Sequence, residues 1–254
     1  MFKYFVRLPR RVHQVQSYIS TVEKYSKHKL INNNATPHWL CEYVPLKSFV
    51  MKYSNTNSKI CWKCKSLSEG KVFCPNCNIL QPLDTSLNYF EILGIEKSFQ
   101  LNKSQLIKIY RNLQTIFHPD KFSIKSEEEQ AIALEHSSAV NKAYNTLSNP
   151  VTRAEYMLVE AGEPITEGEI SLEHDFLMDI MEINEKLADA DDKEVVKEIS
   201  DKNNAIMEDL IRKAEKYFAD EDIKEAKKIV AKLKYYNNIY EKVKEYETKH
   251  GIYD

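Results

Sequence analysis

The sequence predicts an all-α protein in three parts: a small cysteine module, a helical hairpin and an antiparallel three-helix bundle. Only 5 Gly and 8 Pro occur among 254 residues, and Lys and Glu abound, which favours helices over a turn-rich β-sandwich. Apolar residues after Pro82 recur at helical spacing. Four of the five cysteines lie close together before that point. We therefore expect the cysteine module at 59–86, the hairpin domain at 87–162 and the bundle at 163–254.

Residues 1–58 are expected to form a presequence and a poorly ordered linker. The first 22 residues contain no acid and four cations interleaved with apolar side chains: Lys3, Arg7, Arg10 and Arg11. This composition is typical of a mitochondrial presequence, although Pro9 would interrupt a helix and a disordered basic tail is the alternative. We expect the mitochondrial matrix as the location, with a cytoplasmic pool as a second one.

The cysteine module contains two CxxC pairs separated by nine residues. Each pair can bring two thiolates to one ion, so the two pairs supply the four ligands of a tetrahedral site: Cys61, Cys64, Cys74 and Cys77. Zinc is the expected metal, and iron in a rubredoxin-like site has the same geometry. Two redox-active pairs or two disulfides are the other readings. A closed four-thiolate site has no open position for a substrate, so we expect a structural role in a module too short to fold without the ion.

The hairpin domain is expected to begin with a short helix at 87–93 that ends at Gly94. The helices that follow are expected at 102–117, with Asn102 or Ser104 as the cap, at 126–147, and at 151–161 before Gly162.

His118-Pro119-Asp120, called the HPD turn below, breaks the helical pattern between the two longer helices. Proline stiffens the turn, so the flanking side chains would be presented to solvent with little entropy to lose on binding. An ordinary turn in which Asp120 caps the next segment is the alternative. The apolar positions expected to join the two helices are Leu106, Ile109, Tyr110, Leu113 and Phe117 on the first, and Ala131, Leu134, Ala139, Tyr144 and Leu147 on the second.

Three long periodic segments at 172–190, 193–218 and 223–249 form the predicted bundle, because short acidic connections imply antiparallel neighbours. We find no internal repeat. The last segment has an inward stripe and one aromatic residue that points elsewhere: Ala226, Val230, Leu233, Tyr236, Tyr240 and Val243, with Tyr235 outside it.

The first bundle segment has apolar residues on two sides. One narrow stripe suits the core: Phe176, Ile180, Ile183 and Leu187. The opposite side carries Leu177, Met178 and Met181, bordered by Glu182, Glu185 and Asp189. A helix in such a bundle needs only one buried stripe, so the second face is a candidate partner surface. Packing against the hairpin domain is the alternative.

Three motifs resemble a J domain: Tyr89-Phe90-Glu91-Ile92-Leu93-Gly94, the helix that ends in Phe117 and the HPD turn, and Val140-Asn141-Lys142-Ala143-Tyr144. The resemblance implies that His118, Pro119 and Asp120 engage a DnaK-class chaperone and stimulate its ATP hydrolysis. It also implies docking by basic residues of the preceding helix, for which Lys103, Lys108 and Arg111 are candidates. Gln105, Asn112 and Gln114 make this helix less basic than many.

The resemblance extends to the HscB-type co-chaperones of iron–sulfur cluster biogenesis, through residues 152–158, residues 176–185 and the tetracysteine module of the animal form. It implies an L-shaped protein whose bundle binds the scaffold protein on which clusters are assembled. The scaffold site implied by position is Leu177, Met178, Met181, Glu182, Glu185 and Tyr235.

Other classes of function find little support in the sequence. A net charge of -2 argues against a nucleic-acid partner. The sequence contains no stretch of 18 apolar residues, so we expect no membrane partner. We find no nucleophile, base or phosphate-loop arrangement, so we expect a binding protein and not an enzyme; self-association is a further partner hypothesis. A general J protein for unfolded clients, which would need a broad apolar groove, and an iron-containing electron carrier are the alternatives.

Overall fold

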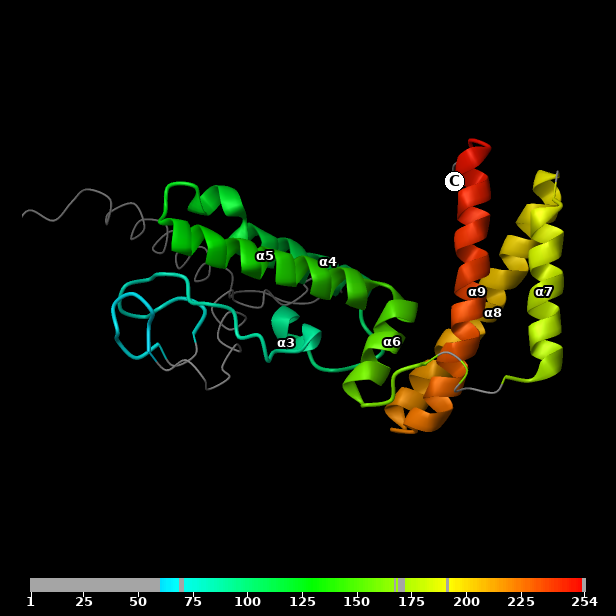
Figure 1. Cartoon of the computed structure of the whole chain (residues 1–254), viewed down its shortest axis with the longest axis horizontal. Coiled ribbons are helices and arrows are strands. Elements are labelled where there is room, and N and C mark those ends of the chain that lie inside the picture. Colours follow the sequence, from blue (N-terminus) through cyan, green and yellow to red (C-terminus); the bar gives the residue numbers. More distant parts are fainter. Residues whose placement is uncertain (1–59, 69–70, 167, 169–171, 191, 253–254) are drawn as a thin grey trace, which may run out of the picture. The chain divides into compact units, whose positions relative to one another are not determined.

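The computed structural model describes residues 60–68, 71–166, 168, 172–190 and 192–252. Helices dominate these ranges, together with one 3₁₀ turn and two isolated β-bridges (Figure 1). The predicted all-α class is thereby confirmed. The proposed presequence and linker at 1–58 and Cys41 lie outside the described residues. Within the described ranges, no helix combines the length and hydropathy needed to cross a membrane.

The hairpin domain is built from short and long helices whose starts are set by polar caps. Helix α3 (Tyr89–Leu93) begins with a reciprocal cap between Asn88 and Glu91 and ends at Gly94, whose φ is 65°. Helix α4 (Lys103–Phe117) is capped by Asn102, and α5 (Glu127–Ser148) by Ser126. Asn102 is therefore the cap of α4, and not Ser104. The 3₁₀ helix η2 (Pro119–Phe122) begins at the second residue of the HPD turn, and His118 is its N-cap.

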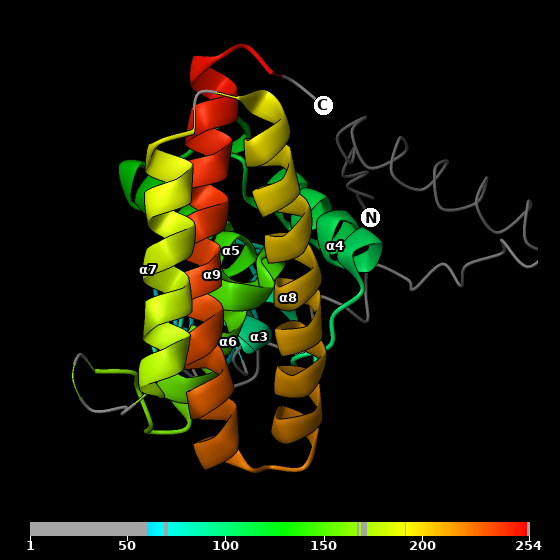
Figure 2. The ribbon, with the colours of Figure 1, turned by 90° about the vertical axis from the view of Figure 1, so that its right-hand side faces the viewer.

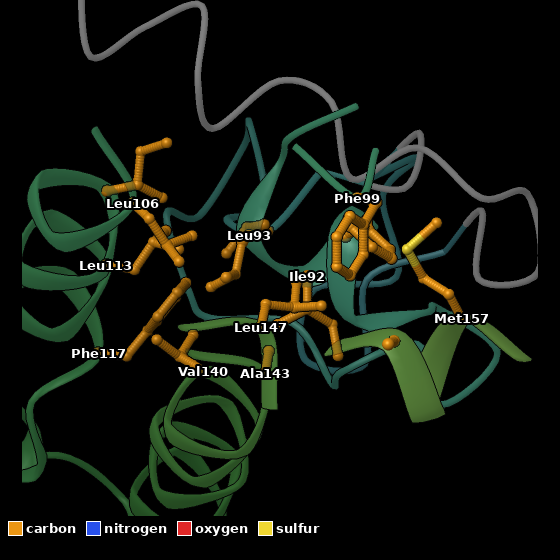
Figure 3. Packing of buried hydrophobic residues seen from close by; sticks show 14 of the residues in the cluster. Ile92, Leu93, Phe99, Leu106, Leu113, Phe117, Val140, Ala143, Leu147 and Met157 are labelled. Carbon is orange, nitrogen blue, oxygen red and sulfur yellow. The ribbon is translucent and has the colours of Figure 1, made fainter. Parts of the chain in front are cut away.

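The core of this domain lies where α3 crosses the α4–α5 pair (Figure 3). Four of the five apolar positions expected on α4 are buried, and Tyr110 stacks on Tyr144 with ring centroids 4.1 Å apart. The expected face of α5 was partly wrong, because Ala131 and Leu134 are exposed. The buried stripe of α5 is Glu129, Ala133, His136, Ser137, Val140, Ala143 and Leu147.

Helix α6 (Pro150–Glu160) leads to three long helices, α7 (His174–Ala188), α8 (Lys193–Ala219) and α9 (Ile223–Lys249). Figure 2 shows these three side by side, and each packs against the other two. Asp192 and Asp222 cap α8 and α9 through their carboxylates. In α9, Ile239 is fully buried where the sequence pattern favoured Tyr240, which is only half-buried.

Helix α9 is buried along more than one side because α6 also packs against it. One continuous buried cluster includes residues of α3 to α6 together with Ala214, Ala226 and Val230 of the bundle. The rings of Phe99 and Phe218 stack at 5.2 Å within it. The hairpin domain and the bundle thus share an apolar core, and its burial stabilises the packing of the two domains together.

Candidate functional site

The four cysteines expected to bind a metal are brought together. Their sulfur atoms all lie within 4.8 Å of one another. Two sulfur–sulfur distances between the pairs are 3.7 Å (Cys61 to Cys77) and 3.6 Å (Cys64 to Cys74). Four sulfurs at the Zn–S distance of about 2.3 Å stand about 3.8 Å apart at the corners of a tetrahedron. The cluster therefore has the dimensions of a four-thiolate metal site, and its cysteines are free thiols.

The two CxxC pairs have the same local geometry. The backbone amides of Lys65 and Asn78 donate to the carbonyls of Cys61 and Cys74, at 3.1 and 2.9 Å. Both residues have a positive φ, 60° and 54°, which curls the chain around the sulfurs. Isolated bridges join residues 60 with 67 and 73 with 80. The sequence signal was short: eight residues, ICWKCKSL and FCPNCNIL.

Polar side chains surround the thiols. The Ser66 hydroxyl lies 2.9 Å from Cys64 Sγ and 3.4 Å from Cys74 Sγ, and the Gln81 amide donates to Cys61 Sγ at 3.4 Å. Hydrogen bonding by Ser66 lowers the pKa of Cys64 to about 5 and also lowers the pKa of Cys74. Such donors favour the thiolate form, which is the form that binds metal.

The cysteine module packs on α5. Leu80 is fully buried within the hairpin-domain core, and its amide donates to Glu129 Oε1 at 3.4 Å. Two helical turns further along α5, His136 Nε2 lies 2.9 Å from the Gln81 carbonyl oxygen. Sequence reasoning missed both α5 residues, since a buried polar side chain is recognised by its partner and not by its own type.

The HPD turn is exposed while its two neighbours are buried. His118, Pro119 and Asp120 face solvent, whereas Phe117 and Phe122 on either side belong to the core. The Asp120 amide donates to His118 Nδ1 at 3.4 Å, and Ser123 Oγ donates to the Asp120 carbonyl at 2.9 Å. Two apolar anchors and these local bonds hold the polar residues in a stiff, accessible turn.

Lys108 and Arg111 are exposed on α4. Lys108 and Arg111 are three residues apart on one side of α4, so a short cationic strip lies on the helix that leads to the HPD turn. Gln114 does not belong to that strip: its amide donates to the Ser137 carbonyl and to Asn141 Oδ1, at 3.1 and 2.8 Å. One of the three residues that lower the charge of α4 is thus used inside the hairpin.

Helix α7 has the two faces expected from its sequence. Ile180 and Leu187 are buried, and Phe176 and Ile183 pack against the same cluster. On the other side, Met178 and Met181 are 50% and 55% exposed, which is unusual for such large apolar side chains. Leu177 is half-buried beside them, and Glu182 and Glu185 are exposed. At about 100° per residue, all five fall within an arc of about 140°, which we call the exposed α7 face.

Aromatic residues connect the core side of α7 with α9. Phe176 meets Tyr235 edge-on at 5.6 Å, and Tyr235 itself is 38% exposed. Lys232 lies 5.4 Å above the Phe176 ring and pairs with Glu173 at 2.8 Å. Glu182 pairs with Lys186 at 2.6 Å, and this bond lowers the pKa of the Glu182 carboxyl. Spacing placed Phe176 in the core stripe, and it packs there. Sequence reasoning missed Lys232, whose partners Glu173 and Phe176 lie at the start of α7.

Two family models match this chain in separate segments. A DnaJ domain matches residues 88–156, and a model described as the HSCB C-terminal oligomerisation domain matches residues 172–244.

Individual relatives match across both segments. The human iron–sulfur cluster co-chaperone protein HscB is 36% identical over 205 residues, which cover 79% of this chain and 87% of the relative. The Arabidopsis thaliana homologue is 30% identical and covers 72% of each chain. The crystal structure of human co-chaperone protein HscB superposes with a TM-score of 0.70 at 36% identity, over 74% of this chain and 98% of that one. Chaperone HscB from Vibrio cholerae gives 0.56 at 31% identity, over 64% and 99%.

Proposed function

Since this chain belongs to the HscB family of J-domain co-chaperones of iron–sulfur cluster assembly, we propose that it bridges two proteins. The HPD turn would engage a DnaK-class chaperone and stimulate its ATPase. The exposed α7 face with Tyr235 would bind the scaffold protein that carries a newly assembled cluster. ATP hydrolysis by the recruited chaperone would then promote transfer of the cluster to acceptor proteins.

One observation carries this proposal: two exposed surfaces of different chemistry lie on separate helices of one folded unit. The HPD turn and the cations Lys108 and Arg111 suit an acidic, polar partner. The exposed α7 face offers methionines beside carboxylates, which suits an apolar patch edged by basic groups. Holding both partners on one body raises their effective concentration toward each other.

The remaining parts of the proposal follow from this role. Zinc is the metal proposed for Cys61, Cys64, Cys74 and Cys77, where it would hold the module folded. Bridging requires no chemistry by this chain, so we propose a binding protein and not an enzyme, without nucleic-acid or membrane partners. The domain limits 59–86, 87–162 and 163–254, the matrix location and self-association stay predictions.

The metal assignment has a direct test. Protein purified without added metal should be colourless, with about one zinc per chain by elemental analysis. A red protein that contains iron would contradict the structural role and favour electron transfer.

The central experiment measures steady-state ATPase of the mitochondrial DnaK-class chaperone with and without this protein and the scaffold. His118→Gln should abolish the stimulation. The triple variant Leu177→Ala/Met181→Ala/Tyr235→Ala should keep the basal stimulation and lose only the increment that the scaffold adds. Ile124→Ala is a matched control, because this large side chain is 91% exposed close to the turn but outside both surfaces.

Two outcomes would contradict the proposal. If the scaffold adds nothing to the wild-type stimulation, cluster transfer is excluded and a general J protein becomes the better hypothesis. If His118→Gln stimulates as well as wild type, the HPD turn is not the chaperone contact.

A further inference from the structure

We propose that Gln81 and His136 are positioning residues that link metal loading of the cysteine module to the end of the hairpin that carries the HPD turn. A loaded module would hold α4 and α5 in the arrangement that presents the turn, and an empty one would release it. The link deepens the proposed function in one respect only, since its effect on a chaperone presupposes that the HPD turn acts as proposed.

Gln81 connects both halves of the metal site to the hairpin domain. Its side chain is almost fully buried and lies between Cys61 Sγ, which accepts from Nε2 at 3.4 Å, and the Trp62 amide, which donates to Oε1 at 3.4 Å. Its backbone amide donates to the Val72 carbonyl at 2.8 Å. The position of the Gln81 backbone is therefore fixed by the fold of the module, and that fold depends on the four sulfurs remaining together.

His136 receives this contact on the other side. The residue is 4% exposed, and Nε2 of its ring lies 2.9 Å from the Gln81 carbonyl oxygen. A carbonyl can only accept, so Nε2 must carry the proton and donate it. A buried donor that loses its acceptor is costly, and the ring would then have to move to find water or another partner.

The ring of His136 leads directly to the turn. It stacks on Phe117 with centroids 4.7 Å apart and planes 18° apart. Phe117 is 2% exposed and immediately precedes His118. A displaced His136 ring would therefore open a gap beside the anchor that holds the first residue of the HPD turn.

A second contact attaches the cysteine module to the same side of α5. The Leu80 amide donates to Glu129 Oε1 at 3.4 Å, and Glu129 lies in the first turn of α5, on the same side as His136. The module thus holds the first turns of α5, from Glu129 to His136. Loss of metal would release both contacts at once.

The experiment compares zinc-loaded and chelated full-length protein by amide hydrogen exchange, with zinc content measured on the same samples. In wild type, chelation should speed exchange about tenfold in peptides from 113–140, while peptides from α8 stay unchanged as an internal control. It should also lower chaperone stimulation several-fold. Unchanged exchange in 113–140 after complete zinc removal would overturn the link.

Two variants separate the hydrogen bond from packing. His136→Phe keeps a ring against Phe117 but removes the donor. Peptides from 113–140 should therefore already exchange fast in the zinc-loaded variant, and chelation should speed their exchange little further. His136→Gln keeps a donor near the Nε2 position, so its exchange should still respond to chelation. Glu135→Gln, at an exposed neighbouring position, should behave as wild type.

Additivity decides between a link and two independent effects. If chelation speeds exchange as much in His136→Phe as in wild type, the residue does not carry the link and the inference is wrong. A linked exchange response in a protein that stimulates no chaperone would leave the inference standing and reject the proposed function. Chaperone stimulation and hydrogen exchange that both stay unchanged on zinc removal would have the opposite meaning. The proposed function would stand, and the inference would be rejected.

Discussion

The Ser66 hydroxyl serves sulfur atoms from both CxxC pairs, because it lies within hydrogen-bond reach of Cys64 and Cys74. Hydrogen bonds to thiolates spread their negative charge and orient their lone pairs toward the metal. Individual polar atoms next to the ligands therefore tune the site as much as the ligands themselves. A single polar atom also matters at the contact with α5, where Nε2 of His136 donates its proton to the Gln81 carbonyl oxygen.

Ser66→Ala should weaken zinc binding by about tenfold or more, because the thiolates of Cys64 and Cys74 lose the one hydroxyl donor that they share. Competition with a chromophoric chelator would measure the affinity. Ser98→Ala is the control, since that hydroxyl bonds the Gln100 carbonyl far from the sulfurs in the sequence. Equal zinc affinities of Ser66→Ala and Ser98→Ala would show that the hydroxyl does not support the metal site.

The stability of the protein should depend on pH through His136. Burial lowers the pKa of His136 below its ordinary value near 6.5, so the ring stays neutral in the folded state. The unfolded chain binds the proton more readily, and stability from this residue is fully present above about pH 6.5 and declines as the pH falls further. Urea unfolding of zinc-saturated protein would measure the free energy of unfolding between about pH 7.5 and 5.5. As the pH falls, this free energy should decline more steeply for wild type than for His136→Gln. Parallel declines would contradict a buried neutral histidine.

At the scale of elements, the helices were predictable and their orientation was less so. Caps at Asn102, Ser126 and Asp222 and the glycine after α3 are local signals, and they placed the helix limits within a few residues. The inner face of α5 could not be read the same way. Its stripe contains His136 and Ser137, and their partners, Gln81 and Gln114, lie on other elements. A polar residue on an amphipathic helix signals solvent until its partner is known.

The corrected face of α5 has a direct test. Leu147→Ala should lower the free energy of unfolding by about 2–5 kcal/mol, because this side chain is completely buried. Leu134→Ala should change it by less than about 0.5 kcal/mol, because Leu134 is 60% exposed. Urea denaturation of the two variants would measure both values. A large loss in Leu134→Ala would mean that this side of α5 is covered.

For the whole molecule, the division into a hairpin domain and a bundle conceals a shared core. The Phe99 ring contacts both the Phe218 ring and the Arg153 guanidinium, which is centred 5.0 Å above it. Arg153 Nη1 donates to the Leu147 carbonyl at 2.5 Å. The HPD turn and the exposed α7 face could be predicted from the sequence, because each is confined to one short segment. The sequence could not reveal the contacts of Phe99 with Arg153 and Phe218, which join residues more than fifty positions apart.

Contacts, and not the connecting chain, should therefore join the two domains. Inserting ten Gly and Ser residues after Thr166 should cost less than about 1 kcal/mol, because each doubling of a loop costs only about 0.6 kcal/mol. Phe218→Ala should cost more, about 3 kcal/mol, because it removes an aromatic ring from the shared core. Urea unfolding would compare the two. A larger loss from the insertion than from Phe218→Ala would mean that the connection itself determines how the domains pack.

The cysteine module also has a place in time. Its outermost sulfur ligands are 16 residues apart, whereas the contact between Gln81 and His136 spans 55. Short loops close faster and at a lower entropic cost than long ones. A folding chain can thus capture its metal first and offer α5 a finished surface on which to fold.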